Sequence, residues 1–262
     1  MPERVTLTIE GPLAYVKLNR PDKHNALDMD MFFAIDTTID RIHKNQSIRA
    51  VVVSGEGASF CSGLDIKSVL SSGQNALRLL WKWLPGNANL AQRVSIGWRR
   101  LDIPVIMALH GKCWGGGMQI ALGGDFRIAS SDCTLAIMES RWGLIPDMGG
   151  TPALRECVGL DQAMRLTMTS DTISAHEALH IGLITQVHEQ PLDAATTLAN
   201  ALVNRSPDTN KTVKRLYQKI WNGRERRILA QETFNQIRII LGKNQRIAVQ
   251  REMHGKDIPF KK

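Results

Sequence analysis

Apolar positions follow two different periodicities along roughly the first 140 residues. Continuous apolar runs over 49–55 and 104–109 are typical of strands buried on both faces. Apolar residues recur at helical spacing over 29–45 and 117–123. Strands that alternate with helices in this way predict an α/β fold. The predicted strands are 5–10, 14–19, 49–55, 104–109, 125–129 and 134–138.

Two further segments depart from this alternation. Residues 71–98 show no regular period and are predicted to be irregular. From residue 151 onward the pattern is mostly helical, with Ser174 as a predicted N-cap and a short strand at 184–187. We therefore expect a core over residues 1–190 and a C-terminal helical region over 191–262.

The glycine triplet Gly115–Gly117 connects a predicted strand to a predicted helix. The first N–H groups of a helix lack intrahelical partners and can hold negative charge on an oxygen. Two carboxylates, Glu139 and Asp147, follow on later segments. Such donors beside a carboxylate base favour proton transfer alpha to a carbonyl group. Alternatively, the glycines form only a tight turn, and Asp147 only caps the helix that begins near Thr151.

Composition narrows the class of protein. The chain has 262 residues, 43% of them hydrophobic, which suits one large domain or a core with a smaller helical part. We see no N-terminal apolar leader and no uncharged stretch long enough to span a bilayer, so we expect a cytoplasmic protein without a membrane partner. The four cysteines are isolated and form no CxxC motif, so no disulfide framework and no metal site are predicted.

The formal net charge is +8, and basic residues are concentrated over 211–227. A basic excess attracts nucleic acid, anionic membranes or phosphate-bearing ligands. The helical spacing of the basic residues favours a solvated helix face, and no aromatic RNA-binding motif accompanies these residues. Nucleic acid is therefore not the expected partner, and RNA binding remains an alternative.

Five motifs in the same order make the chain resemble the enoyl-CoA hydratase/isomerase (crotonase) superfamily over nearly its whole length. The resemblance implies a spiral of ββα units with a C-terminal helical region that trimerises. It also implies an acyl-CoA substrate, no permanently bound cofactor beyond the coenzyme A of that substrate, and a homotrimer or hexamer. The motifs are LNRPDKHNALD (18–28), SFCSGLDIK (59–67), GKCWGGGMQIALGGDFRIAS (111–130), MESRWGLIPDMGGTPALRECVG (138–159) and ISAHEALHIGLITQV (173–187).

The matching motifs assign functional roles to residues of this chain. In the family two backbone N–H groups hold the thioester oxygen, and these fall on Leu64 and Gly116, both at predicted helix starts. Trp81 and Trp83 lie in the segment that shapes the acyl pocket of relatives, with core packing as the alternative. The residues that the resemblance implies for coenzyme A and substrate binding are Lys23, Ala26, Leu27, Ser62, Leu64, Ile66, Lys67 and Gly116.

The carboxylates depart from the pattern of the family's hydratases, which use two glutamates. The first of these positions is Gln119 here, and the second is Glu139. An amide is neither a useful acid nor a useful base, although it can hold a water or a substrate group by hydrogen bonds. Asp147 lies eight residues after Glu139, and this spacing of a glutamate and an aspartate resembles that of dienoyl-CoA isomerases. Those isomerases carry an aspartate where this chain has Gln119, so the match is partial.

These residues favour an enzyme that shifts a carbon–carbon double bond through a thioester enolate, that is, an enoyl-CoA or dienoyl-CoA isomerase. Glu139 is the expected base, Asp147 an assisting acid and Gln119 a positioning group. The alternatives are hydration, another reaction of the superfamily such as thioester hydrolysis, decarboxylation or carbon–carbon cleavage, and a non-catalytic homologue that binds coenzyme A or RNA.

Overall fold

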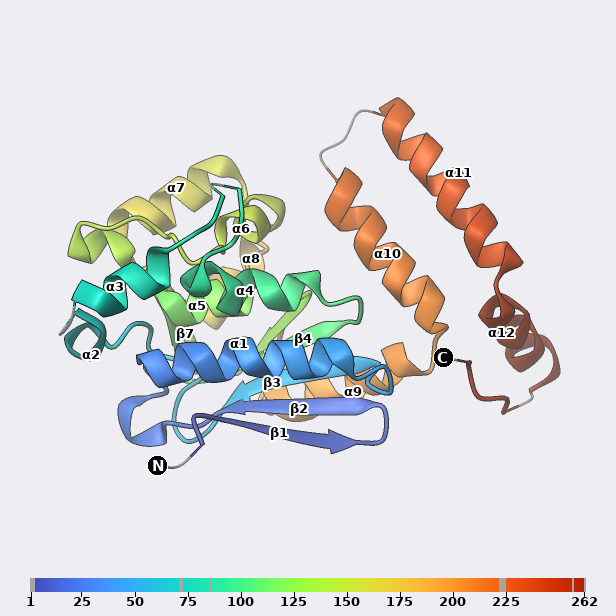
Figure 1. Cartoon of the computed structure of the whole chain (residues 1–262), viewed down its shortest axis with the longest axis horizontal. Helices are drawn as coiled ribbons and strands as arrows, with labels where there is room; N and C mark the ends of the chain where they lie inside the picture. The colour runs from blue at the N-terminus through green and yellow to red at the C-terminus, as the bar shows by residue number, and fades with distance from the viewer. Residues whose placement is uncertain (1–2, 71–72, 85, 222–224, 256, 262) are drawn as a thin grey trace.

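The computed structural model describes residues 3–70, 73–84, 86–221, 225–255 and 257–261. Its centre is a six-stranded sheet with the strand order β1-β2-β3-β4-β6-β9, beside a three-stranded sheet with the order β5-β7-β8 (Figure 1). The strands of the large sheet are β1 (Val5–Glu10), β2 (Leu13–Leu18), β3 (Ala50–Gly55), β4 (Val105–Leu109), β6 (Phe126–Ala129) and β9 (Gln186–Val187). Those of the small sheet are β5 (Lys112–Trp114), β7 (Thr134–Ala136) and β8 (Ile173–Ser174).

Successive strand pairs divide between the two sheets, which produces the spiral that the resemblance implies. β4 joins the large sheet and β5 the small one, and β6 and β7 repeat that division. β1 and β2 form the predicted antiparallel hairpin, in which Val5 pairs with Leu18. The other neighbouring strands of the large sheet are parallel. Their carboxyl ends therefore lie along one edge of the sheet, where the loops that carry the candidate site begin.

Helices cover both faces of the large sheet. Successive side chains of a strand point to opposite faces, and the buried strands carry apolar side chains on both. Val52 and Ile106 face α9 and pack with its Ala195 and Ala199. Val51, on the other face, belongs to the larger core, to which the helices on that side contribute. The helices up to α9 are η1 (Pro21–Lys23), α1 (Met29–Lys44), α2 (Ile66–Leu70), α3 (Gly73–Leu80), α4 (Leu90–Arg100), α5 (Gly116–Leu122), η2 (Glu139–Trp142), α6 (Thr151–Cys157), α7 (Leu160–Thr169), α8 (Ala175–His180) and α9 (Pro191–Val203).

The prediction of an irregular segment over 71–98 was wrong, because much of it forms α3 and α4. Asn89 caps α4 in a capping box with Gln92, and the helix buries Trp98 completely. The short strand β5 was also missed. It has only three residues, and it is held by pairing with β7, about twenty residues later. α3 and α4 are amphipathic and α4 has a local capping box, so the sequence contained signals for them that were overlooked, whereas β5 depends on a distant partner that local periodicity does not reveal.

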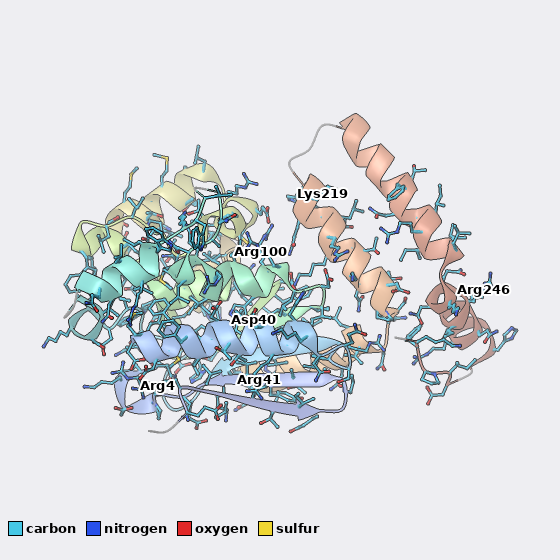
Figure 2. The ribbon with its side chains drawn as sticks, viewed as in Figure 1. Arg4, Asp40, Arg41, Arg100, Lys219 and Arg246 are labelled. Atoms are coloured by element: carbon cyan, nitrogen blue, oxygen red, sulfur yellow. The ribbon has the colours of Figure 1, made fainter. Side chains whose placement is uncertain are left out.

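In the described part of the C-terminal region three helices follow α9, namely α10 (Pro207–Ile220), α11 (Glu225–Leu241) and α12 (Lys243–His254). α10 is joined to the main body by ion pairs from Lys214 to Asp125 and from Arg215 to Asp102. α11 and α12 extend away from the sheets (Figure 1), and Figure 2 shows basic residues such as Lys219 on α10 and Arg246 on α12. Within the described ranges, no helix is both long and apolar enough to cross a membrane.

Candidate active site

Two segments lie side by side at the edge of the large sheet, and glycines allow their close approach. Cys61 forms a parallel bridge with Cys113, and the Trp114 amide donates to the Cys61 carbonyl at 3.0 Å. A Cβ atom on Gly63 would lie 2.9 Å from the Trp114 carbonyl oxygen, and the φ of Gly115 is +51°. Only glycine tolerates both demands without strain. The sequence motifs around Gly63 and Gly115 are therefore held against one another.

The backbone amides of Leu64 and Gly116 occur on these neighbouring segments. Gly116 is the first residue of α5, where an N–H group has no intrahelical partner. Leu64 does not begin a helix as predicted; it forms a bridge with Leu27, two residues before α2 starts. Within the described residues neither amide donates a hydrogen bond. Both N–H groups are consequently without a hydrogen-bond acceptor among the described residues.

The residues expected to bind coenzyme A lie along the same bridge. The Leu27 amide donates to the Gly63 carbonyl at 2.8 Å, and the Ser62 amide donates to the His24 carbonyl at 2.9 Å. This pairing places the first two motifs next to each other. The structure thereby brings together the predicted residues Lys23, Ala26, Leu27, Ser62 and Leu64, with Ile66 and Lys67 at the start of α2.

Two residues hold this arrangement although they were not singled out from the sequence. Asn25, which is fully buried at a φ of +55°, donates through Nδ2 to the carbonyls of Glu56 and Ser59. Arg20 donates to the Ala26 carbonyl at 3.0 Å and forms an ion pair with Asp65 at 2.9 Å. Both residues belong to the first motif, LNRPDKHNALD, so their place in that motif is the signal that could have identified them.

Gln119 and Glu139 meet in the interior of the site. Gln119 lies on α5 and is 1% exposed, and its Nε2 donates to Glu139 Oε1 at 2.5 Å. The Gln119 Oε1 accepts hydrogen bonds from the amides of Met148 at 2.8 Å and Gly150 at 3.4 Å. Glu139 Oε2 is buried and has no hydrogen-bond partner among the described residues. The site thus contains a half-buried glutamate with one hydrogen-bonded carboxylate oxygen and one that has no partner among the described residues.

Burial raises the pKa of Glu139 because the charged form loses hydration. The hydrogen bond from Gln119 acts in the opposite direction and lowers this pKa, whereas the negative charge of Asp147 raises it again. A carboxylate with a raised pKa holds a proton more strongly than an ordinary glutamate does. Its base strength is therefore closer to what proton abstraction near neutral pH requires.

Asp147 is an exposed residue on the loop between η2 and α6. Although the residue is exposed, the surrounding protein removes part of the water from its carboxyl group, and this desolvation raises the pKa of Asp147. The alternative in which Asp147 caps the next helix is wrong, because the N-cap residue of α6 is Gly150. Asp147 is thus a titratable group at the rim of the site, close enough to influence Glu139 through its charge.

Trp81 and Trp83 do not pack in the core. They are 60% and 86% exposed, and their rings meet edge to face at 6.5 Å. With Phe33 and Leu77 they line a surface cavity of about 780 Å³ that does not include Gln119 or Glu139. Among the described residues, no group of three or more His, Cys, Asp or Glu side chains is placed to hold a metal ion.

The enoyl-CoA hydratase/isomerase family model matches residues 8–253. A short-chain-enoyl-CoA hydratase of Clostridium acetobutylicum is 35% identical over 213 residues, which cover 80% of this chain and 79% of that protein. The mitochondrial Delta(3,5)-Delta(2,4)-dienoyl-CoA isomerase of Mus musculus is 33% identical over 202 residues, which cover 74% of this chain and 62% of that protein. The structure of an enoyl-CoA hydratase from Bacillus anthracis superposes with a TM-score of 0.88 at 23% identity and covers 98% of this chain and 99% of that one.

The chain therefore belongs to the enoyl-CoA hydratase/isomerase family, and the expected α/β fold of the crotonase type is confirmed. The protein is an acyl-CoA enzyme of that family. Its relatives differ in the reaction that their names describe, so the reaction of this chain has to be argued from its own side chains.

Proposed function

We propose that the protein is an enoyl-CoA isomerase that shifts a carbon–carbon double bond through a thioester enolate. The observation that supports this most directly is the set of hydrogen bonds made by the Gln119 side chain. Its amide group is engaged on both sides, by Glu139 and by the amides of Met148 and Gly150. Gln119 cannot carry a proton, so the half-buried Glu139 is left as the member of this pair that can.

In this proposal the thioester oxygen of a 3-enoyl-CoA accepts hydrogen bonds from the amides of Leu64 and Gly116. Glu139 Oε2 removes a proton from the alpha carbon, and the electron pair spreads over the oxygen and the conjugated carbons. The two N–H donors stabilise the negative charge on the oxygen. The protonated Glu139 then returns its proton to the gamma carbon, which leaves the double bond between the alpha and beta carbons. No group is gained or lost.

Hydration places a stronger demand on the site. One group must take a proton from water while another supplies a proton to the alpha carbon, and the family's hydratases use two glutamates for this. Gln119 stands at the position of the first. Hydration is nevertheless the second candidate, because the clostridial relative at 35% identity is a hydratase. In that case Asp147 or a bound water would replace the missing glutamate.

A dienoyl-CoA substrate adds a role for Asp147. Its double bonds extend further from the thioester, so a proton has to be delivered at a more distant carbon. A carboxyl group at the rim with a raised pKa is suited to donate that proton. We therefore propose Asp147 as the assisting acid for dienoyl substrates.

The experiment compares two rates of the wild-type enzyme. Conversion of 3-hexenoyl-CoA to the conjugated 2-enoyl thioester is followed by ultraviolet absorbance, and water addition to crotonyl-CoA by loss of the same absorbance. We expect isomerisation to be faster. Equal rates would make the isomerase proposal wrong and would favour the hydratase.

Coenzyme A binding is tested separately. We propose that Ala26, Leu27, Ser62, Leu64, Ile66 and Gly116 contact the ligand through their main chain, with Lys23 and Lys67 near its phosphates. Both lysines are exposed. Calorimetry with octanoyl-CoA is expected to show binding that weakens when Lys67 is replaced by methionine. No measurable heat at millimolar ligand would contradict this part of the proposal.

A non-catalytic RNA-binding role has less support. The basic residues of α10 that would contact RNA are partly engaged within the chain, since Lys211 and Arg215 both pair with Asp102. Lys214 is half-buried and pairs with Asp125. These pairs leave α10 with a smaller free positive charge than its sequence indicates.

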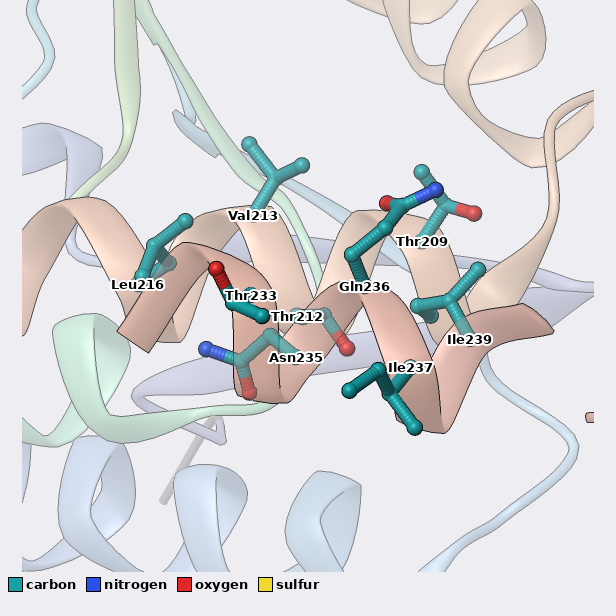
Figure 3. Close-up of a pocket in the computed structure, with 9 residues that line it drawn as sticks. All are labelled: Thr209, Thr212, Val213, Leu216, Thr233, Asn235, Gln236, Ile237 and Ile239. Atoms are coloured by element: carbon teal, nitrogen blue, oxygen red, sulfur yellow. The ribbon is translucent and has the colours of Figure 1, made fainter. Parts of the chain in front are cut away.

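We also propose a homotrimer, alone or paired into a hexamer. α11 exposes Ile237 and Ile240, each about half accessible. Leu216 lines a cavity of about 490 Å³ between α10 and α11 (Figure 3). The sequence of the helical tail has apolar positions at Leu216, Ile220, Leu229, Ile237 and Ile240 that need a partner surface. Of these, Ile220 and Leu229 have side chains outside the described part of the chain. Light scattering at micromolar concentration is expected to give at least three chains per particle, and a monomer would contradict the proposal.

A further inference from the structure

The side chain of Gln119 connects three parts of the site, namely α5, η2 and the segment 145–150, here called the Asp147 loop. Its amide oxygen accepts from two backbone N–H groups of this loop, those of Met148 and Gly150. If the amide turned over, its NH₂ group would face these donors. The oxygen is therefore fixed toward the loop and the nitrogen toward Glu139.

This fixed amide makes the two oxygens of Glu139 different. Oε1 accepts the hydrogen bond from Gln119, whereas Oε2 is buried without a partner among the described residues. An oxygen that already accepts a hydrogen bond holds an incoming proton less strongly than a free one. Oε2 is consequently the oxygen that is left to receive a proton from a substrate carbon.

The same amide holds the Asp147 loop against α5. The contact is close, because a Cβ atom on Gly150 would lie 3.2 Å from both Cα and Cγ of Gln119. Asp147 immediately precedes Met148, whose N–H group donates one of the two hydrogen bonds that Gln119 Oε1 accepts. The negative charge of Asp147 acts on Glu139 from this loop. The distance between the two carboxylates therefore depends on the hydrogen bonds of Gln119.

We infer that Gln119 is a positioning residue, which makes Oε2 of Glu139 the proton-carrying oxygen and keeps the Asp147 loop at a set distance from it. The inference rests on the proposed function in one respect, that Glu139 is the base; it does not require the net reaction to be isomerisation. It explains why a residue without acid–base capacity occupies the centre of the site.

Two substitutions separate the two roles of the amide. Gln119→Met has a similar length and loses the bonds to both Glu139 and the loop. Gln119→Glu keeps an oxygen for the Met148 amide but loses the donor toward Glu139, so that two carboxyl groups face each other and share a proton. Gln46→Met, at an exposed position outside the site, is the matched control.

The primary measurement is exchange of the alpha protons of butyryl-CoA with deuterium from D₂O, followed by NMR across a pH series. This assay reports proton removal by Glu139 without any net reaction. Activity requires ionised Glu139, so it is lost as the pH falls through the pKa of that group. Loss of the Gln119 hydrogen bond is expected to move this acid limb to higher pH in both variants. The exchange rate of Gln119→Met should fall about 10- to 100-fold, the range expected for a hydrogen bond to a charged group.

The second measurement is a double-mutant cycle with Asp147→Asn. Removal of the Asp147 charge is expected to move the acid limb of the wild-type enzyme to lower pH, opposite in sign to the effect of Gln119→Met. In the Gln119→Met background the loop is no longer held, so Asp147→Asn should have a smaller effect. In the Gln119→Glu background, where the loop contact survives, the effect should be retained.

An unchanged acid limb and rate in Gln119→Met, or strictly additive effects in the double mutant, would overturn the inference. Wild-type enzyme that exchanges the alpha protons but does not isomerise would refute the proposed function and leave the positioning role supported by the exchange profiles. Wild-type enzyme with neither activity would refute both. Calorimetry with octanoyl-CoA checks that each variant still folds and binds.

Discussion

Replacement of Glu139 by glutamine is the most direct test of the proton-carrying role. The substitution preserves the size of the side chain and allows its carbonyl oxygen to accept the hydrogen bond from Gln119. Its NH₂ group then lies where Oε2 was, a buried position without a partner in the described structure. What is lost is the ability to take and return a proton.

The expected magnitudes follow from this geometry. An unsatisfied buried NH₂ group costs about 1–3 kcal/mol, but the variant no longer buries a negative charge. These effects oppose each other, so the melting temperature should change by no more than roughly 4 °C. Loss of acid–base catalysis should lower turnover at least about 100-fold, or about 2.7 kcal/mol in the activation free energy.

The pH profile gives an independent prediction for the same variant. The folded pKa of Glu139 is raised by burial above 4.5, its ordinary value. Wild-type activity should therefore decline at a pH above 4.5 as the solution becomes acidic, because the base becomes protonated. The residual activity of Glu139→Gln should lack this acid limb.

The assays are isomerisation of 3-hexenoyl-CoA and deuterium exchange of butyryl-CoA, with octanoyl-CoA calorimetry to show that binding survives. Glu189→Gln, at an exposed position, is the control and should match wild type in both assays. If Glu139→Gln retained more than about a tenth of the wild-type rate in both assays, another group would have to be the base.

Three further substitutions test the assisting acid, a half-buried ion pair and the packing of α5. Asp147→Asn should slow a 3,5-dienoyl-CoA substrate more than 3-hexenoyl-CoA, since only the former needs a proton far from the thioester; equal losses in kcat would contradict this. Lys214→Met leaves the half-buried Asp125 carboxylate without its ion-pair partner at 2.7 Å and should lower the free energy of unfolding by about 1–3 kcal/mol in urea titrations. Gly117→Ala places a Cβ atom 2.4 Å from the Cys61 carbonyl oxygen, so it should destabilise the protein by about 1–3 kcal/mol or more and displace the neighbouring Gly116 amide at the start of α5.

The last two predictions have matched controls. Lys219→Met removes a positive charge from an exposed position of the same helix as Lys214, so it should change stability by less than about 0.5 kcal/mol. Gly73→Ala introduces a methyl group with no atom of the described residues within 4 Å, and it should likewise be tolerated. A Lys214→Met or Gly117→Ala variant as stable as its control would show that the contact at that position carries little energy.

The sequence by itself determined much of the framework. The hairpin over β1 and β2 and the buried strands β3 and β4 were predictable because their apolar patterns are local and unbroken. The five motifs also identified the family, which the comparisons confirm. Glycine spacing indicated the turn before α5, because the conformation at Gly115 depends on the residue itself.

Only the tertiary structure decided how the site is assembled. Nothing local shows that β5 pairs with β7, or that Leu64 forms a bridge with Leu27 instead of beginning a helix. The sequence likewise left open whether Asp147 caps α6, and the structure assigns that cap to Gly150. Gln119 and Glu139 are twenty residues apart, and their contact depends on how α5 packs against the chain that follows β7. Periodicity specifies which residues are buried, whereas hydrogen bonds between distant segments specify which buried groups meet.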